Sequence, residues 1–164
     1  MVILGVDPGF RITGYGIIKK DGQKAYLLDQ GALRLNPQKH LSERVFLFHE
    51  FMTEKILAHQ VQAICLETPF MGKNAQNFLK LGYLRGILYL LAAKHKLALT
   101  ELAPTEIKMS LTGFGFASKE QVADVVLRLF PGMQMPDKLD ITDAVAIAVC
   151  GLWKTNQPVH SLRV

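Results

Sequence analysis

Ile3-Leu4-Gly5-Val6-Asp7-Pro8-Gly9 stands near the start of the chain and decides how the rest can fold. The stretch is an apolar run that stops abruptly at the carboxylate of Asp7. Proline has no backbone N–H to give to a sheet and glycine favours turns, so Pro8-Gly9 should end the strand. The pattern predicts a buried strand whose last residue is an acid at the edge of a sheet, with a purely local turn role for Asp7 as the alternative.

A second segment repeats this design further along the chain. Residues 61–67 form a short apolar run that ends in Glu67 and is followed by Thr68-Pro69. Glutamate is disfavoured in strands, so Glu67 has the weakest purely structural explanation of the acids considered. A helix between two parallel strands makes a right-handed crossover, so the two acids should meet at one edge of the sheet if their strands are neighbours. Ligands of such sheets bind beyond the carboxyl ends of the strands.

The other segments predict an α/β domain with a mixed sheet. Residues 13–20 and 25–35 are strand-like and are separated by the turn dipeptide Asp21-Gly22, so the first three strands should form an antiparallel meander. The remaining predicted elements are a strand at residues 97–102 and helices at residues 40–60, 74–96, 104–112, 118–130 and 140–153. The first of these helices should bury one face, made of Leu41, Val45, Phe48, Met52 and Ile56.

Two further acids open the last predicted helix. Asp140 and Asp143 are three residues apart, which places them on one helix face with about 5 to 6 Å between their β-carbons. Helix capping and the helix dipole would explain both acids without any function. Together with Asp7 and Glu67 they make four carboxylates, which would repel one another strongly unless a cation binds them. All-oxygen ligation suits Mg²⁺ or Mn²⁺, and two such ions about 3.5 to 4 Å apart are common in phosphoryl cleavage.

Composition and charge fit one globular domain with an acidic partner. The chain has 164 residues, 49% of them hydrophobic, and a formal net charge of +5, which favours nucleic acid without establishing it. Cys65 and Cys150 lie in apolar runs and should be core residues. The five histidines lack zinc-binding spacing, and the sequence has neither a phosphate-binding loop with its lysine nor a nucleophile-triad signature. We expect neither secretion nor membrane insertion, because a leader-like segment and a long uninterrupted apolar run are both missing.

Taken together, these residues resemble a known family, the RuvC Holliday-junction resolvases of the ribonuclease-H-like superfamily. The matching motifs are Gly5-Val6-Asp7-Pro8-Gly9 with Thr13-Gly14-Tyr15-Gly16, Glu67 with Phe70-Met71 and Lys73-Asn74, Leu79-Lys80-Leu81-Gly82 with Arg85-Gly86, and residues 140–148. The resemblance implies a ribonuclease-H-like α/β fold: a mixed five-stranded sheet, with a three-strand antiparallel meander plus two parallel strands, flanked by helices on both faces. The nuclease domain would span residues 1–153, with a short C-terminal tail at residues 154–164.

The resemblance also implies roles for individual residues. Those implied for catalysis and for binding divalent metal are Asp7, Glu67, Asp140 and Asp143. Lys108 and Lys119 would assist at the cleaved phosphate, and ordinary solvated lysines are the alternative. Phe70 is associated with stacking on junction bases, for which core packing is the alternative. The residues expected to meet further phosphates are Lys73, Lys80 and Arg85.

The activity that the resemblance implies is metal-dependent resolution of four-way DNA junctions in recombination and repair. Paired symmetric cuts would leave 5′-phosphate and 3′-hydroxyl nicks, and each site would hold two Mg²⁺ ions, for which Mn²⁺ can substitute. Symmetric cutting requires two sites, so we expect a homodimer, with Gly82 and Gly86 allowing close approach of the helix at residues 74–96. Packing of this helix within the chain is the alternative. A branch-migration complex of the RuvA and RuvB type and a cytoplasmic location complete the expectation.

Two positions depart from the pattern of the family. Pro69 stands between Glu67 and Phe70 and puts the reach of Phe70 in question. Phe10 replaces a small polar residue after the turn, where it could touch DNA or pack on the sheet edge.

Two functions of other classes stay open. Actin-like sugar kinases and chaperone ATPases share the Asp-x-Gly turn, but they clamp nucleotide between two such domains and this chain has the length of one. A catalytically silent junction-binding adaptor would tolerate substitution of the acids.

Overall fold

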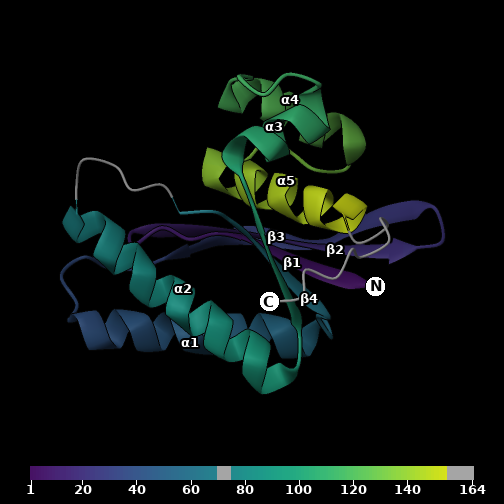
Figure 1. Cartoon of the computed structure of the whole chain (residues 1–164). Coiled ribbons are helices and arrows are strands. Elements are labelled where there is room, and N and C mark those ends of the chain that lie inside the picture. The colour runs from purple at the N-terminus through teal and green to yellow at the C-terminus, as the bar shows by residue number, and fades with distance from the viewer. Residues whose placement is uncertain (70–74, 155–164) are drawn as a thin grey trace, which may run out of the picture.

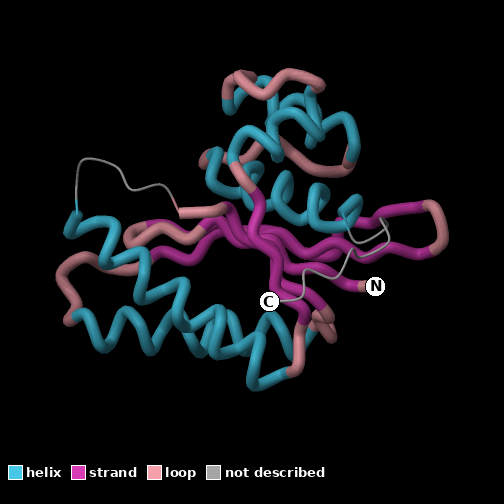
Figure 2. Tube along the Cα trace, viewed as in Figure 1, coloured by secondary structure: helices cyan, strands magenta, loops and turns pink. Residues whose placement is uncertain are grey.

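The computed structural model describes residues 1–69 and 75–154, which form three layers with a sheet between two groups of helices (Figure 1, Figure 2). The strands are β1 (Val2–Asp7), β2 (Ile12–Asp21), β3 (Lys24–Arg34), β4 (Ala63–Glu67) and β5 (Ala98–Leu102). The helices are α1 (Leu41–Ala58), α2 (Ala75–His95), α3 (Pro104–Thr112), α4 (Lys119–Leu129) and α5 (Leu139–Lys154). The predicted order of elements is confirmed. Lys154, the first residue of the predicted tail, ends α5, and the rest of that tail lies outside the described residues.

The strands form one mixed sheet in the order β3-β2-β1-β4-β5. Strands β1, β2 and β3 are antiparallel neighbours, whereas β4 runs parallel to β1 and β5 runs parallel to β4. Asp7 stands opposite Gly14, and Val6 stands opposite Leu66, so β1 and β4 end at the same edge of the sheet. The predicted meander and the predicted meeting of the two acid-tipped strands are therefore confirmed.

Helices cover both faces of this sheet. On one face lies α5, with α3 and α4 beyond it, and on the other lie α1 and α2 (Figure 1). Side chains of β1 alternate between the two cores, since Ile3 packs with the α5 core whereas Leu4 and Val6 pack with the α1 and α2 core. Both cysteines, Cys65 and Cys150, are free and buried, as predicted.

Glycines let α5 lie directly against the sheet. A β-carbon on Gly14 would stand 1.9 Å from the backbone oxygen of Asp140, and one on Gly5 would stand 2.2 Å from that of Ala144. Any larger residue at these positions would push the helix away. Because Gly14 is the sheet partner of Asp7, this contact brings the first turn of α5 beside the end of β1.

The first turns of α1 differ from the prediction. Leu41, expected in the buried stripe, is 44% exposed, and Arg44 is buried instead. The Arg44 guanidinium donates a hydrogen bond to the backbone oxygen of Phe10 and lies 3.9 Å from the centre of the Phe10 ring. Phe10 thus packs against the core beneath α1, which was one of its two possible roles. The stripe residues that are fully buried as predicted are Phe48, Met52 and Ile56.

Candidate active site

Asp7 and Glu67 are the last residues of two neighbouring parallel strands, and both side chains are partly buried. The turn after Asp7 is closed by Thr13, whose hydroxyl donates to the Gly9 oxygen at 2.9 Å and accepts from the Gly9 N–H at 3.3 Å. The turn therefore has its own polar partner. The carboxylate of Asp7 is not needed to close it and can serve another purpose.

The two acids of α5 lie beside this edge of the sheet. Asp140 and Asp143 occupy the start of the helix, where carboxylates are stabilised by the helix dipole. Thr142, between them, is fully buried and its hydroxyl donates to the Leu139 oxygen at 2.8 Å, which anchors this first turn. The contact with Gly14 fixes the turn against β2. Sheet and helix therefore bring acids from distant parts of the chain to one place.

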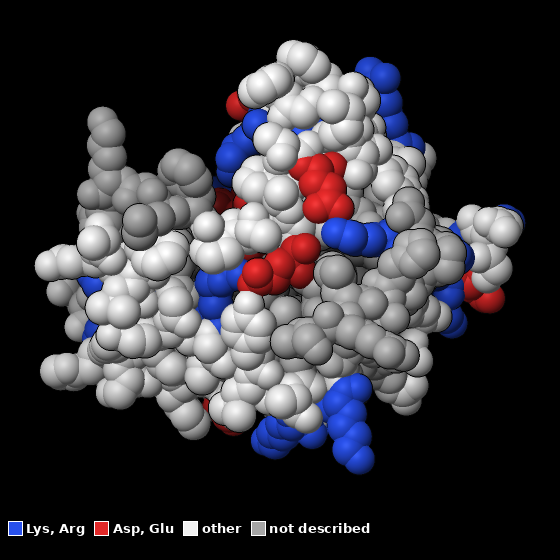
Figure 3. All heavy atoms as spheres, viewed as in Figure 1, with Lys and Arg blue, Asp and Glu red and all other residues white. Residues whose placement is uncertain are grey.

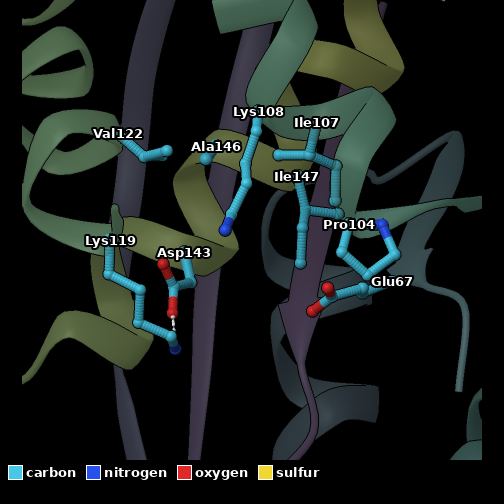
Figure 4. Close-up of a pocket in the computed structure, with 9 residues that line it drawn as sticks. All are labelled: Glu67, Pro104, Ile107, Lys108, Lys119, Val122, Asp143, Ala146 and Ile147. Atoms are coloured by element: carbon cyan, nitrogen blue, oxygen red, sulfur yellow. Dashed lines mark hydrogen bonds and ion pairs between the residues drawn. The ribbon is translucent and has the colours of Figure 1, made fainter. Parts of the chain in front are cut away.

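A pocket opens between the end of β4 and the helices α3, α4 and α5 (Figure 4). Lys108 projects into it from α3, with its ammonium directed toward the space between Asp143 and Glu67. Lys119 enters from α4 and forms an ion pair with Asp143. The residues that line the pocket are Glu67, Pro104, Ile107, Lys108, Lys119, Val122, Asp143, Ala146 and Ile147.

Lysine is an unusual residue at the start of a helix, where Lys119 lies. Ser118 caps α4, since its hydroxyl accepts from the Gln121 N–H at 3.2 Å, so Lys119 is the first helical residue, as predicted. A positive charge at the N-terminus of a helix is unfavourable because it opposes the helix dipole. The neighbouring carboxylate of Asp143 compensates for this, and together with the other acids it raises the pKa of Lys119 against the effect of burial. The lysine is held toward the pocket by its acidic partner.

Electrostatic repulsion dominates the acidic side of the pocket. Burial, followed by the charge of Asp143, raises the pKa of Asp7 from 3.8 to about 7, and Lys119 only partly opposes this. Burial and then the charge of Asp143 also raise the pKa of Glu67. Burial raises the pKa of Asp143 too, although its bond with Lys119 works in the other direction. The carboxylates are therefore close enough to oppose one another's ionisation, and the lysines do not fully neutralise them.

This donor set fits a hard divalent cation. All four acids offer oxygen ligands, which Mg²⁺ and Mn²⁺ prefer, and their unrelieved repulsion would be removed by bound positive charge. Among the described residues, no three acid, histidine or cysteine side chains already converge in metal-binding geometry. The Lys119 ammonium holds one carboxylate, Asp143, in its present orientation. The acids would therefore have to reorient before they could hold a metal together.

The remaining predicted DNA contacts fall into three groups. Phe70 and Lys73 lie outside the described residues. Lys80 is exposed on α2, as a phosphate contact would require. Arg85 is different, because it is buried and its guanidinium is bonded to the backbone oxygen of Glu67 and to the carboxylate of Glu101.

Glu101 was missed by the sequence reading, although the sequence carries a signal for it. It stands within the apolar run of β5, where a glutamate is disfavoured unless its charge has a partner. Its partners come from α2: Arg85 and the hydroxyl of Tyr89. The acid is therefore part of the support around the end of β4.

Basic side chains do not gather into one continuous surface on the face shown in Figure 3. There, acidic and basic side chains lie next to each other. Attraction of a polyanion to this face would therefore be local. Within the described ranges, none of the helices is long and apolar enough to cross a membrane.

Comparisons with known proteins agree on one family. The family model described as crossover junction endodeoxyribonuclease RuvC matches residues 3–151. The crossover junction endodeoxyribonuclease RuvC of Pelodictyon phaeoclathratiforme is 43% identical over 152 residues, which cover 93% of this chain and 80% of the relative. The Thermus thermophilus RuvC structure is similar with a TM-score of 0.86 and 28% identity, covering 94% of this chain and 95% of that one. Thermus thermophilus RuvC in complex with a Holliday junction substrate gives a TM-score of 0.88 at 28% identity, covering 94% of both chains.

Proposed function

This chain belongs to the RuvC family of crossover junction endodeoxyribonucleases, and from this premise we propose that it resolves four-way DNA junctions by phosphodiester hydrolysis in recombination and repair. The observation that carries the proposal is the pocket where acids from β4 and α5 meet lysines from α3 and α4, beside the acid that ends β1. Such a set of groups suits a polyanionic substrate that must be cut next to a phosphate. A relative of similar fold is described in complex with a Holliday junction substrate, which supports the choice of DNA.

We propose Mg²⁺ as the cofactor, with Mn²⁺ as a possible substitute and two ions in each site. The residues that would hold them are Asp7, Glu67, Asp140 and Asp143. When bound, the ions would activate water and neutralise charge that develops on the phosphate. The raised pKa of Asp7 supports this, because a cation would relieve the repulsion that raises it.

The two lysines have a separate task in this proposal. Lys108 and Lys119 lie on opposite sides of Asp143 in the pocket and would bind the non-bridging oxygens of the phosphate to be cut (Figure 4). Fixed cations in a partly enclosed pocket stabilise the extra negative charge of the transition state more than that of the ground state. The products would be a 5′-phosphate and a 3′-hydroxyl, so the nicks could be ligated.

Symmetric cutting of a four-way junction requires two sites, and we propose a homodimer built on α2. Gly82 and Gly86 are exposed on α2, and an added β-carbon on either would meet no atom of the chain within 4 Å. They border an apolar hollow between α1 and α2 that a second copy could fill, and the residues lining it are His40, Leu41, Ser42, Val45, Gly82, Tyr83, Gly86 and Ile87. Sedimentation of the wild type and of Gly82→Glu tests this: a dimer that becomes a monomer is expected, and a monomeric wild type would contradict it.

The wider assembly follows from the same proposal. Phe70 would stack on junction bases, and Lys73 and Lys80 would contact phosphates. A branch-migration complex of the RuvA and RuvB type in the cytoplasm would supply and move the junction. Domain bounds of residues 1–153, with a tail at residues 154–164, remain part of the proposal.

One experiment tests the activity. A labelled four-way junction and a linear duplex of matched sequence are incubated with the protein, with and without Mg²⁺. Paired cuts in the junction alone, and only with metal, are expected. Equal binding and cutting of duplex would leave a general nuclease, and binding without any cutting would favour a silent adaptor. Binding of ATP by the isolated chain would favour the ATPase alternative.

A further inference from the structure

Arg85 of α2 is buried beside the end of β4, with only 7% of its surface exposed. One terminal nitrogen of its guanidinium donates a hydrogen bond of 2.6 Å to the backbone oxygen of Glu67. The other terminal nitrogen is paired with the carboxylate of Glu101 in β5. One side chain thus joins α2 to two neighbouring strands at the edge where the pocket lies.

The sheet register explains why the Glu67 oxygen needs this donor. The Thr68 N–H donates to the Leu102 oxygen of β5 at 2.8 Å, and the C=O and N–H of one planar trans peptide unit point in opposite directions, so the Glu67 carbonyl points away from β5. Glu67 therefore directs its carbonyl toward β1, where the next donor in the parallel ladder would be the N–H of residue 8. Residue 8 is proline and has no N–H.

Arg85 supplies the bond that Pro8 cannot make. A buried backbone carbonyl without a partner is unfavourable, and a guanidinium is a strong donor that reaches it from the neighbouring layer. Glu101 and Tyr89 hold that guanidinium in place, since the Tyr89 hydroxyl, one helical turn beyond Arg85, also donates to Glu101. Turning the arginine toward solvent would leave the Glu67 carbonyl without this donor and the Glu101 carboxylate without its positively charged partner. This geometry does not suit a phosphate contact.

We propose that Arg85 is a positioning residue for Glu67, fixing the end of β4 so that the Glu67 carboxylate enters the pocket in one direction. The inference rests on the proposed function, in which Glu67 is a metal ligand. It also gives α2 a direct connection to the pocket through a single side chain. Removing the donor should loosen the metal ligand while leaving the other acids and the exposed DNA contacts in place.

Three variants separate the loss of the Arg85 hydrogen-bond donor from the effect of leaving the Glu101 carboxylate buried without its partner. Glu101→Gln is the reference, because it keeps an acceptor for Arg85 and allows the arginine to be removed without stranding a carboxylate. Adding Arg85→Met removes the donor. Adding Pro8→Ala to that pair restores a backbone N–H opposite the Glu67 oxygen. Arg128→Met, at an exposed arginine on α4, is the control for losing an arginine elsewhere.

Divalent-metal affinity, measured by calorimetry on the protein without DNA, is the deciding measurement. We expect Glu101→Gln and Arg128→Met to bind Mn²⁺ nearly as the wild type does. The variant lacking the donor should bind it roughly 10- to 100-fold more weakly, as is typical when the partner of a metal ligand is lost. Pro8→Ala should recover most of this loss. Junction binding in the absence of metal should stay the same in all of them.

Two results would overturn the inference. One is metal affinity that does not change when the donor is removed, and the other is failure of Pro8→Ala to restore it. If the variant lacking the donor does not fold, the restored variant should fold, and an unfolded protein in both cases also counts against Arg85 as the substitute for the ladder bond. A fall in metal-free junction binding, with a weaker salt dependence, would show that Arg85 contacts phosphate instead.

The proposed function is judged on a different measurement. Cleavage of the four-way junction by the wild type tests it, whereas the role of Arg85 is read from metal affinity alone. A wild type that binds metal but does not cut junctions would refute the function and leave the positioning role standing. A wild type that binds no divalent metal would remove both.

Discussion

The two faces of the sheet hold the acidic edge in different ways. On the α5 face, helix backbone meets sheet backbone, because Gly5 and Gly14 leave no room for side chains between them. On the other face, α1 and α2 reach the same edge through buried arginines: Arg44 bonds to the oxygen of Phe10, just past Asp7, and Arg85 bonds to that of Glu67. The α5 face is held by close contacts at glycines, whereas the other face is held by two long arginine side chains.

This difference predicts different sensitivity to substitution. Contact between two backbones has no flexible part, so an added methyl group on the α5 face must displace the helix. A guanidinium bridge can be replaced by another group that fills the space or donates the bond. Substitutions at Asp7, at the glycine contact and at Arg44 test this contrast, and the expected effects decrease in that order.

The largest effect on catalysis is expected at Asp7, which lies at the edge of the sheet that the helices of both faces hold. Asp7→Asn keeps the shape of the side chain and removes its charge, so metal-dependent cleavage should fall by a factor on the order of a thousand or more. Junction binding should survive, because phosphate contacts are made by other residues. Cleavage kinetics and gel-shift titration on the same labelled junction measure the two quantities. A variant that still cuts would remove Asp7 from the centre of the site.

Stability of the metal-free protein should depend on pH through the same acid. Burial, and next the charge of Asp143, raises the pKa of Asp7 to about 7, so the folded chain holds this proton more tightly than the unfolded chain does. The resulting stability is fully present below about pH 4 and is lost as the pH rises toward 7, by at most roughly 4 kcal/mol. Glu67 and Asp143 shift in the same direction.

Denaturant unfolding in EDTA between pH 4 and 8 measures this dependence. The fall in stability with rising pH should be smaller in Asp7→Asn, which has no proton to lose, and Mg²⁺ should oppose it in the wild type. Equal slopes for the two proteins would show that other groups control the pH dependence.

Substitution at the glycine contact should have the next largest effect. Gly14→Ala would place its β-carbon 1.9 Å from the Asp140 oxygen, so α5 must move away from β2. We expect a loss of about 1 to 3 kcal/mol in the free energy of unfolding, together with weaker metal binding as the α5 acids shift. Gly132→Ala is the matched control, because a β-carbon there meets no atom within 4 Å. Equal stability of both variants would mean that α5 adjusts without strain.

The smallest effect on stability is expected at Arg44. Arg44→Met keeps a long apolar stem over the Phe10 ring and removes a buried guanidinium whose Nε has no hydrogen-bond partner among the described residues. The free energy of unfolding should change by less than about 1 kcal/mol, because the cost of leaving the Phe10 oxygen without its donor is opposed by the gain from no longer burying a charged group with an unsatisfied Nε. Thermal unfolding of this variant beside Gly14→Ala gives the comparison directly. A larger loss at Arg44 would reverse the contrast between the two faces.

The sequence predicted those parts of the molecule that depend on local pattern. Acid-tipped strands, the Asp21-Gly22 turn and the Ser118 cap are all visible in a few adjacent residues, and the structure confirms these elements. The exposed Leu41 was not predicted, because periodicity counts apolar residues and cannot show that Arg44 finds an acceptor beneath the helix. Similarly, the predicted phosphate contact of Arg85 did not take account of its burial or of its bonds to Glu67 and Glu101.

The partner of Arg85 could not be predicted from the sequence, and the reason is physical. In our inference, the carbonyl that Arg85 binds lacks a sheet donor because Pro8 stands at the next position of the parallel register, and register cannot be read from either strand alone. The same holds for Gly14, whose importance arises from a helix that begins more than a hundred residues later. The convergence of the acids was predictable, whereas the groups that hold them depended on the assembled fold.

Gly151, near the other end of α5, has a consequence for how the molecule can move. A β-carbon there would stand 2.2 Å from the Cys65 sulfur of β4, so α5 is seated on the sheet at both ends of its length. The helix can neither slide along the strands nor tilt away from them without breaking several close contacts. We therefore expect slow hydrogen exchange throughout α5. The acid-bearing helix would then act as a stationary reference against which the substrate is placed.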